Sequence, residues 1–283
     1  MVTVVIATRN RATSLATTLE RVTPLAPVVV VDNGSGDATS AMTRARFPSV
    51  RLLTLDRNDG AYARNLGARL ATTPYVAFCD DDCWWAPGSL DRAVEVLESN
   101  PHVGLLNARV LVGSEQRLDP ACAAMAASTL PSRDTVPGRL IVAFMAGASV
   151  VRRSLFLRLG GFHRRYHIGA EESLLSIDLL DAGYAIVYCE DVVVHHHPSP
   201  AERDHELRRF LVSRNQLWTS WLRRPLAVAC RETAHLVRLA CRDRIARRAL
   251  LHAAAGLPWV LRERRVVGAD VERVLVLVPT AGP

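Results

Sequence analysis

The sequence contains no lysine, so all 35 of its basic residues are arginines. It also has no long hydrophobic run. The longest, residues 140–151, is interrupted by Gly147 and falls short of the roughly 18 residues needed to cross a bilayer. The chain starts in a strand pattern with no basic region before it, so we expect no signal peptide and a cytoplasmic location.

Several common ligand motifs are missing as well. No Gly-rich dinucleotide fingerprint follows the first predicted strand and there is no P-loop, which argues against a dehydrogenase and a P-loop NTPase. The six cysteines contain no Cys-x-x-Cys pair. We therefore expect reduced packing residues rather than zinc ligands or a disulfide framework.

The net charge of +7 is concentrated near the C-terminal end. Residues 1–200 carry 19 arginines against 20 acidic residues, whereas residues 201–265 carry 15 against 6. The arginines of the second segment lie on helical patterns at 206–222 and 228–251, together with leucine and tryptophan. Such a basic segment favours an anionic membrane surface as partner. The alternative, to which we give more weight, is that its apolar side packs on the protein and its arginines are simply solvated.

Other features of this segment complete the prediction. Pro225 and Pro258 are expected to interrupt the helices, and residues 275–278 predict a final edge strand. Aromatic residues are not interleaved with the arginines in a stacking pattern, so we expect no nucleic-acid partner.

Strand and helix patterns alternate along the first part of the chain. Apolar runs predict buried strands at 2–7, 28–31, 50–55 and 75–78, each followed by a polar loop and a helical pattern. This alternation predicts an α/β fold with a mostly parallel sheet. Because such strands end at one edge of the sheet, Thr8, Asp32, Arg64 and the run Asp80 to Asp82 are expected to meet there.

The second half of the chain is less regular. Strands are predicted at 104–112, 184–188 and 192–194, whereas 113–139 is predicted to be irregular. The small residues between Met145 and Ser149 allow close approach of the backbone.

Two acidic clusters are candidates for chemistry. Asp80, Asp81 and Asp82 follow a buried strand, where like charges repel one another and are costly to desolvate, so Mg²⁺ or Mn²⁺ is a natural compensator. A solvated acidic loop is the alternative. Glu171 and Glu172 open a leucine-rich helical pattern, where the helix dipole favours acids, so capping explains one of the pair as well as catalysis does.

The order of these motifs resembles that of family 2 of the glycosyltransferases, over about residues 2–200. The matching stretches are Val4–Arg11, Val30–Ser35, Asn58–Gly67, Asp80–Asp82, Gly160–Phe162, Glu171–Glu172 and the histidines at 195–197. The resemblance implies a GT-A-like fold. It divides the chain into a catalytic domain at 1–200, with a nucleotide-sugar-binding half at about 1–112 and an acceptor half at about 113–200, and a basic helical extension at 201–283.

The resemblance also assigns roles to residues of this chain. Metal ligands would be Asp80, Asp82 and either His196 or His197, and the catalytic base would be Glu172, with Glu171 second. The donor would be bound by Thr8, Arg9, Asp32, Asn58, Arg64, Asp80 and Asp81. The family usually has Glu-Asp at the base position, so the carboxylate here reaches one methylene further. The basic turn at 163–165, where the family usually has an acid, hints at a charged acceptor, although a solvated turn explains it better.

The resemblance implies an inverting, metal-assisted glycosyltransferase of cell-envelope polysaccharide biosynthesis. Its donor would be a nucleoside diphosphate sugar, with UDP or dTDP favoured, and its acceptor a glycan or a lipid-linked molecule. It could lie peripherally at the inner face of the plasma membrane. A second hypothesis is a non-catalytic membrane or assembly module of the same fold that binds anionic surfaces through its arginines.

Overall fold

The structure, a computed structural model, describes residues 1–131, 136–198 and 204–277. Its first part alternates strands and helices as predicted. These elements are β1 (Val2–Thr8), α1 (Ala12–Val22), β2 (Val28–Asp32), α2 (Thr39–Arg46), β3 (Arg51–Thr54), α3 (Tyr62–Leu70) and β4 (Tyr75–Cys79). The run Asp80 to Asp82 follows directly and forms a turn into the short strand β5 (Cys83–Trp85).

The second part adds the rest of the sheet and a group of helices. It contains α4 (Ser89–Ser99), β6 (Val103–Val112), β7 (Arg117–Leu118), α5 (Pro120–Ala126), β8 (Arg139–Ile141), β9 (Ala148–Arg152), α6 (Arg153–Arg158), a 3₁₀ turn (Arg164–Tyr166), α7 (Glu171–Asp181) and β10 (Ala185–His196). The C-terminal helices are α8 (His205–Arg223), α9 (Leu226–Ala240), α10 (Arg244–Ala255), α11 (Leu257–Glu263) and α12 (Ala269–Leu277).

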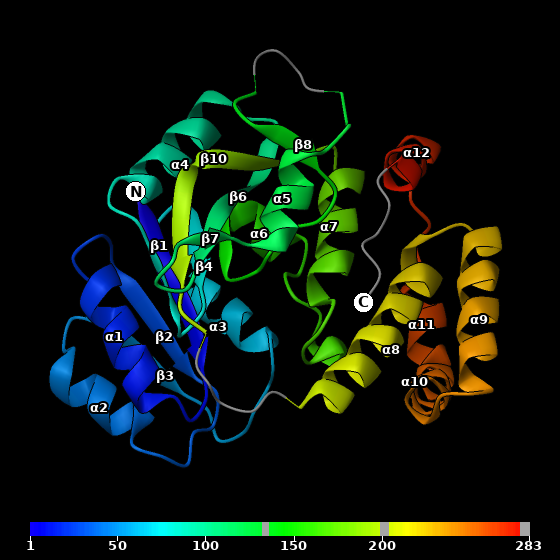
Figure 1. Ribbon diagram of the computed structural model, residues 1–283, viewed down its shortest axis with the longest axis horizontal. Helices are drawn as coiled ribbons and strands as arrows, with labels where there is room; N and C mark the ends of the chain where they lie inside the picture. Colours follow the sequence, from blue (N-terminus) through cyan, green and yellow to red (C-terminus); the bar gives the residue numbers. More distant parts are fainter. Residues whose placement is uncertain (132–135, 199–203, 278–283) are drawn as a thin grey trace.

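One mixed sheet runs through the first two-thirds of the molecule, with helices on both faces (Figure 1). Its strand order is β3-β2-β1-β4-β9-β6-β10-β5, with β7 on β6 and β8 on β10. The predicted parallel half, β3-β2-β1-β4, is present. Beyond it β9 runs antiparallel to both β4 and β6, an inversion that hydrophobic periodicity cannot predict.

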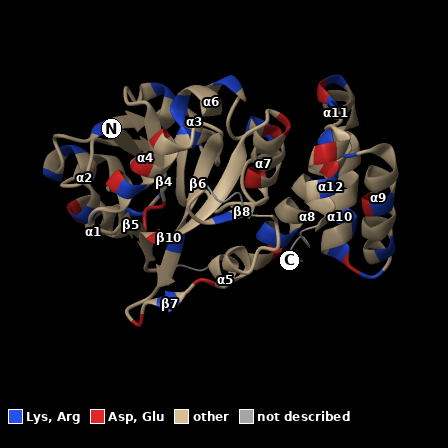
Figure 2. Ribbon diagram, turned by 90° about the horizontal axis from the view of Figure 1, so that it is seen from above, with Lys and Arg blue, Asp and Glu red and all other residues tan. Residues whose placement is uncertain are grey.

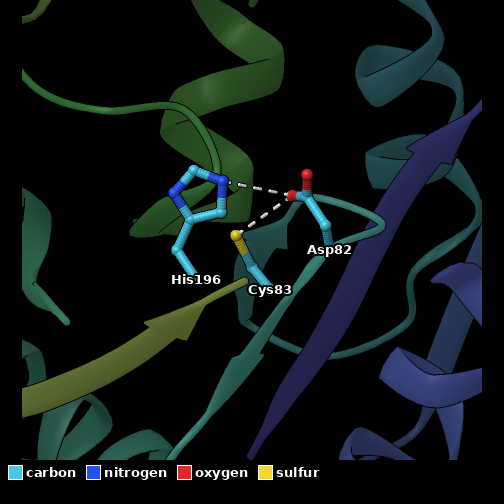
Figure 3. Close-up of side chains that lie close together, drawn as sticks. All are labelled: Asp82, Cys83 and His196. Atoms are coloured by element: carbon cyan, nitrogen blue, oxygen red, sulfur yellow. Dashed lines mark hydrogen bonds and ion pairs between the residues drawn. The ribbon is translucent and has the colours of Figure 1, made fainter. Parts of the chain in front are cut away.

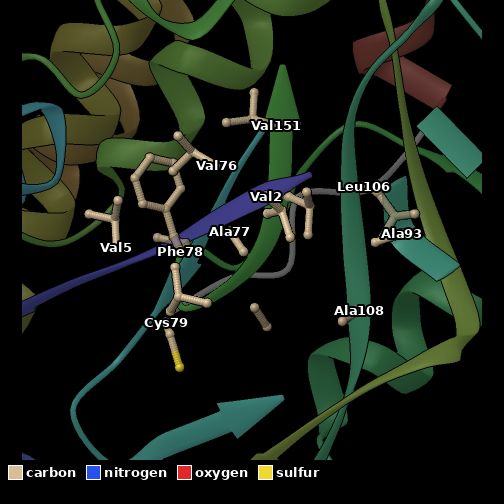
Figure 4. Close-up of a cluster of buried hydrophobic side chains, with 14 of the residues drawn as sticks. Val2, Val5, Val76, Ala77, Phe78, Cys79, Ala93, Leu106, Ala108 and Val151 are labelled. Atoms are coloured by element: carbon tan, nitrogen blue, oxygen red, sulfur yellow. The ribbon is translucent and has the colours of Figure 1, made fainter. Parts of the chain in front are cut away.

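Apolar β-branched residues build the centre of this sheet. Both β2 and β4 are buried at every position, and part of the cluster around Phe78 is drawn in Figure 4. Helix α3 packs closely on the sheet because Gly67 faces Val5 and Val31, where a Cβ would overlap the Val5 side chain. This tight packing fixes the start of α3, and hence Arg64, relative to the end of β4.

Three predictions for the C-terminal segment need correction. The expected edge strand at 275–278 is wrong, since α12 is helical through Leu277; Val278 lies outside the described residues. The single helical stretch at 228–251 is two helices, because Asp243 starts α10 by accepting a hydrogen bond from the Ile245 amide. Pro258 does not interrupt a helix but stands in the first turn of α11, where its missing N–H costs nothing.

Two further predictions are corrected in the sheet. The stretch at 113–139 is not wholly irregular, since it contains β7, α5 and the start of β8; residues 132–135 lie outside the described part. Helix α5 begins because Asp119 caps it and Pro120 fills its first position. The expected strands at 184–188 and 192–194 are one strand, β10, whose pairing with β6 shifts register between Cys189 and Val193.

The C-terminal helices lie together beside the sheet, at the end of the molecule away from α1 and α2 (Figures 1 and 2). Helix α8 connects the C-terminal helices to the sheet region by packing on α7. Tyr166 belongs to the cluster of buried apolar side chains that the C-terminal helices form. Within the described residues, no helix combines the length and the apolar character required to cross a membrane.

Candidate active site

The ends of three neighbouring strands bring the predicted residues together. Thr8 is paired in register with Asp32, and the Thr8 hydroxyl donates a hydrogen bond of 2.7 Å to Asp81 Oδ2. The buried Asp32 carboxylate accepts hydrogen bonds from the Ser35 amide and the Ser40 hydroxyl. The prediction that these residues share one edge of the sheet is therefore confirmed.

The triple-Asp turn places three carboxyl groups next to one another at the end of β4. Burial raises the pKa of Asp81 to about 6 together with the charges of Asp80 and Asp82, although the hydrogen bond from Thr8 acts in the opposite direction. Arg11 is the nearest basic group to Asp81, at 3.9 Å. A turn with three adjacent carboxyl groups suits a bound cation.

Asp80 faces a second part of the site. Its carboxylate accepts a hydrogen bond of 2.5 Å from Arg64 Nη2 in α3. It also lies over the backbone of Gly147, where an added Cβ would come within 3.0 Å of the carboxylate. The small-residue passage thus allows the close approach that the sequence predicted.

Arg64 links Asp80 to the acidic start of α7. Its Nη1 lies 4.0 Å from Glu171 Oε1, and Glu171 is 4% exposed. Arg64 Nε and Glu171 Oε2 are buried without a hydrogen-bond partner in the described part of the chain. Buried polar atoms without a hydrogen-bond partner reduce the stability of a fold, so these two atoms indicate a site that receives a polar ligand.

Glu172 lies next to the same group and is only partly buried. Burial, and after it the charge of Glu171, raise its pKa to about 8, although Arg64 and the Ala146 amide act in the opposite direction. Burial also raises the pKa of Glu171, opposed by Arg64. A carboxyl group with a pKa near neutrality can exchange a proton with a substrate.

Asp82 belongs to a different cluster, with Cys83 and His196 (Figure 3). His196 Nε2 lies 3.5 Å from Asp82 Oδ1, and the Cys83 thiol donates to the same oxygen at 3.6 Å. One ligand atom from each residue lies within 4.8 Å of the others. Burial raises the pKa of Cys83, as do the neighbouring carboxylates, so this thiol stays protonated here.

The neighbouring histidines face the other way. The rings of His195 and His197 lie 5.7 and 4.6 Å from the Trp84 ring, which also carries the Arg21 guanidinium on its face. The backbone amide of His197 donates a hydrogen bond to the Asp82 carbonyl. Of the two histidines considered as metal ligands, His196 is the one whose ring lies beside Asp82.

The remaining predicted donor residues form the outer part of the edge. Arg9 is exposed and its Nε donates to the Gly34 carbonyl at 3.4 Å. The Asn58 side chain accepts from the Gly60 amide and so closes its own turn. Asn33, which was not predicted, holds this turn to β2 through the Gly60 carbonyl and the Asp59 amide.

The Gly-Gly-Phe motif has a structural partner that the sequence did not reveal. Asn65, buried next to Arg64, donates to the carbonyls of Gly160 and Phe162 and accepts from the Phe162 amide. Gly161 has φ +65° and a Cβ there would strike Asn65, so only glycine fits. Arg64 and the 160–162 turn are thereby fixed to each other.

The basic turn that follows is engaged within the protein. Arg164 donates to both carboxylate oxygens of Asp59, His163 pairs with Glu263, and the Arg165 guanidinium lies 5.3 Å from the Trp259 ring centre. The hint of a charged acceptor at this turn therefore gains no support.

Asn215 of α8 is a further residue that sequence analysis missed. Its Nδ2 donates to the carbonyls of Tyr166, Ile168 and Gly169, in the loop that leads to Glu171, and the residue is fully buried. Arg214 adds hydrogen bonds to the Arg165 and Tyr166 carbonyls. An Asn on the apolar stripe of α8, four residues after Leu211, was the available signal.

Comparisons with known proteins agree with this geometry. The sequence model of glycosyl transferase family 2 matches residues 3–160. N-acetylglucosaminyl-diphospho-decaprenol L-rhamnosyltransferase of Mycobacterium tuberculosis is 28% identical over 203 residues, which are 60% of this chain and 66% of that protein. Pre-mycofactocin glycosyltransferase of the same organism is 30% identical over 208 residues, 72% of this chain and 44% of that protein. The matches span less than two thirds of these relatives' length.

Solved structures are similar in fold. A mannosyltransferase from Pyrobaculum calidifontis, in complex with GDP-Man and Mn²⁺, superposes with a TM-score of 0.57 at 23% identity and covers 100% of this chain and 76% of its own. Residues 1–349 of S. aureus TarS with UDP give 0.55 at 20% identity, over 75% and 64%. These likenesses confirm the predicted GT-A-like α/β fold.

Proposed function

The chain belongs to glycosyl transferase family 2, and on this basis we propose that it transfers a sugar from a nucleoside diphosphate sugar to an acceptor hydroxyl. The observation that carries the proposal is the group around Arg64. This buried cation joins Asp80, at the end of β4, to Glu171, at the start of α7. An anion-binding group and a potential base thus share one edge of the sheet, where ligands bind in open α/β folds.

The residues present fit a divalent cation. Asp82 and His196 offer an oxygen and a nitrogen beside each other, and Asp80 adds a partly exposed carboxylate in the same turn. Carboxylate oxygens are the ligands that suit Mn²⁺ or Mg²⁺. We propose Asp80, Asp82 and His196 as the residues that hold it, with His197 kept at Trp84. A bound cation would stabilise the negative charge that develops on the departing nucleoside diphosphate.

Arg64 is proposed to bind the donor diphosphate. Its guanidinium is held by Asp80 on one side, and its buried Nε still has a hydrogen to donate. Thr8, Arg9, Asp32 and Asn58 lie along the neighbouring strand ends and complete the proposed nucleotide site, together with Asp81. Their placement supports the assignment because Thr8 and Asp32 are the last residues of β1 and β2, Arg9 and Asn58 lie in the loops after β1 and β3, and Asp81 lies in the triple-Asp turn.

Glu172 is proposed as the general base. The acceptor oxygen attacks the anomeric carbon, its proton passes to the Glu172 carboxylate, and the bond from that carbon to the diphosphate oxygen breaks. A single displacement of this kind inverts the anomeric configuration. Glu171 is the second candidate, but its contact with Arg64 and its deeper burial favour a role in holding Arg64 and in raising the pKa of Glu172.

The relatives suggest the substrate class. The rhamnosyltransferase named above acts on a decaprenol-linked diphosphate, so a lipid-linked acceptor is part of the proposal. UDP or dTDP remains the favoured donor nucleotide, although one structural neighbour holds GDP-Man. We also propose the division into a catalytic part at 1–200 and a helical extension at 201–283, whose Asn215 supports the loop before Glu171.

The test is release of nucleoside diphosphate from a panel of UDP-, dTDP- and GDP-sugars, with Mn²⁺, with Mg²⁺ and with EDTA. We expect release from one donor, dependent on metal and lost in Asp82→Ala. Asp91→Ala, a change at an exposed carboxylate on α4, is the matched control and should behave as wild type. If no donor is cleaved, and none raises the melting temperature, the non-catalytic module becomes the better explanation.

A further inference from the structure

Exposed apolar side chains gather on the C-terminal helices. Of the thirteen large hydrophobic residues that are exposed in the described part of the chain, ten lie between residues 205 and 277. The same segment carries the positive charge of the protein, with 15 arginines against 6 acids between residues 201 and 265. Helix α9 lies at the outer edge of this group and packs on α8 and α10 (Figures 1 and 2). Its outward face is therefore open to a partner.

That face carries a continuous apolar stripe. Leu226, Cys230, Ala234 and Val237 of α9, with Cys241 at its C-cap, follow one another at intervals of four, four, three and four residues, which aligns them on one side of the helix. All five are exposed, Leu226 by 70% and Val237 by 44%. A helix on the surface of a globular protein normally buries such a stripe against its neighbours. This exposed stripe is therefore either a docking surface or an unusual loss of folding free energy.

A basic stripe runs beside it. Arg231, His235 and Arg238 repeat at the same helical spacing, Arg242 continues it in the turn after α9, and all four are exposed. The acids near them are already paired, Glu232 with Arg231, Asp243 with Arg209 and Glu206 with Arg244. Within the described chain, Arg238 and Arg242 are left without a carboxylate partner. Their charge is available to an external anion.

We infer that α9 docks this protein on an anionic membrane surface. The apolar stripe enters the boundary between head groups and acyl chains, and the arginines beside it meet the lipid phosphates. The stripe consists of aliphatic and small residues without an aromatic anchor, which is unlike the centre of a protein interface and unlike a base-stacking surface. This docking goes beyond the proposed sugar transfer and does not depend on it.

The first test is binding of the full chain to vesicles of phosphatidylcholine alone and of phosphatidylcholine with phosphatidylglycerol. We expect binding only to the anionic vesicles, weakening as salt is raised. The double variant Arg238→Gln/Arg242→Gln should bind about thirtyfold more weakly. Arg46→Gln/Arg117→Gln removes the same charge from exposed positions on α2 and β7, so it should bind as wild type does.

The native cysteines give a second, structural readout. Cys230 and Cys241, both on the stripe, are exposed, whereas the other four are buried. A polarity-sensitive thiol dye on either one, with the other changed to Ser, should shift its emission to the blue when anionic vesicles are added. Val237→Asp should abolish both the shift and the binding without lowering the melting temperature, because the side chain is exposed.

Three results would overturn the inference. The first is absence of binding to the anionic vesicles, and the second is equal binding to both kinds of vesicle. The third is that the protein associates with itself as its concentration rises, that Val237→Asp removes this association, and that no vesicle binding is seen. The stripe would then be an interface between copies of this chain.

Discussion

The assignment of Glu172 as the base makes a quantitative prediction about pH. A carboxyl group whose pKa is about 8 is roughly 10% ionised at pH 7 and roughly 90% ionised at pH 9. Since only the carboxylate accepts a proton, kcat/KM for transfer should rise about tenfold over this interval. Glu172→Gln removes the base and should lower kcat/KM by roughly 10²–10⁴-fold, with no remaining rise.

The neighbouring glutamate separates this assignment from its alternative. The charge of Glu171 raises the pKa of Glu172, so Glu171→Gln should move the midpoint of the profile to lower pH while activity is retained. Glu172→Asp should keep part of the activity, because it restores the carboxylate one methylene shorter. If Glu171→Gln is inactive and Glu172→Gln is not, the roles are reversed; a flat wild-type profile would refute the assigned ionisation.

A stability measurement tests the same pKa without any substrate. The raised pKa of Glu172 means that the folded protein favours the neutral form. Its contribution to the free energy of unfolding is therefore fully present below about pH 4.5 and is lost as the pH rises through about 8. Because the side chain is partly exposed, this loss is a few kcal/mol at most. The melting temperature of Glu172→Gln should fall less between pH 5 and pH 9 than that of wild type.

Three other changes test the surroundings of the site. Asn215→Ala removes the donor of the buried Gly169 carbonyl and of the partly buried Ile168 carbonyl, while Arg214 still donates to the Tyr166 carbonyl. We expect a loss of about 1–3 kcal/mol in the free energy of unfolding and a lower kcat with an unchanged donor Kd; an unaltered urea midpoint would contradict the role of the side chain. Gly147→Ala places a methyl group against the Asp80 carboxylate and should reduce kcat by roughly a hundredfold, whereas Ala146→Gly should not. Asp82→Asn should weaken Mn²⁺ binding by roughly 10–100-fold in calorimetric titration, and an unchanged affinity would exclude Asp82 as a ligand.

Much of the catalytic edge could be predicted from the sequence. Continuous β-branched runs form buried strands, and parallel strands end at a common edge, so Thr8, Asp32 and the triple-Asp turn had to meet. The acidic start of α7 followed from its leucine spacing. These features depend on residues that are close together in the sequence or on general rules for parallel sheets. Both can be applied to the sequence without knowledge of the tertiary structure.

The tertiary structure decided which side chains touch. At the end of β10 successive side chains point to opposite faces, so the rings of His195 and of His197, the residue after the strand, lie at Trp84 and the ring of His196 lies beside Asp82; the sequence shows the alternation but not which face holds the acid. The bond between Asn215 and the loop before Glu171 joins positions 46 residues apart or more. Such a contact leaves no local pattern, because it depends on how α8 folds back.

The C-terminal helices show the same division. The order of their residues predicted that they are basic and amphipathic, but it could not say which apolar side chains would be covered. Packing of α9 on α8 and α10 buries Leu236 and Ala240 and leaves Leu226 and Val237 outside. Burial is a property of the neighbours that a helix acquires on folding, so only the tertiary structure separates the apolar side chains of the core from those left for a partner.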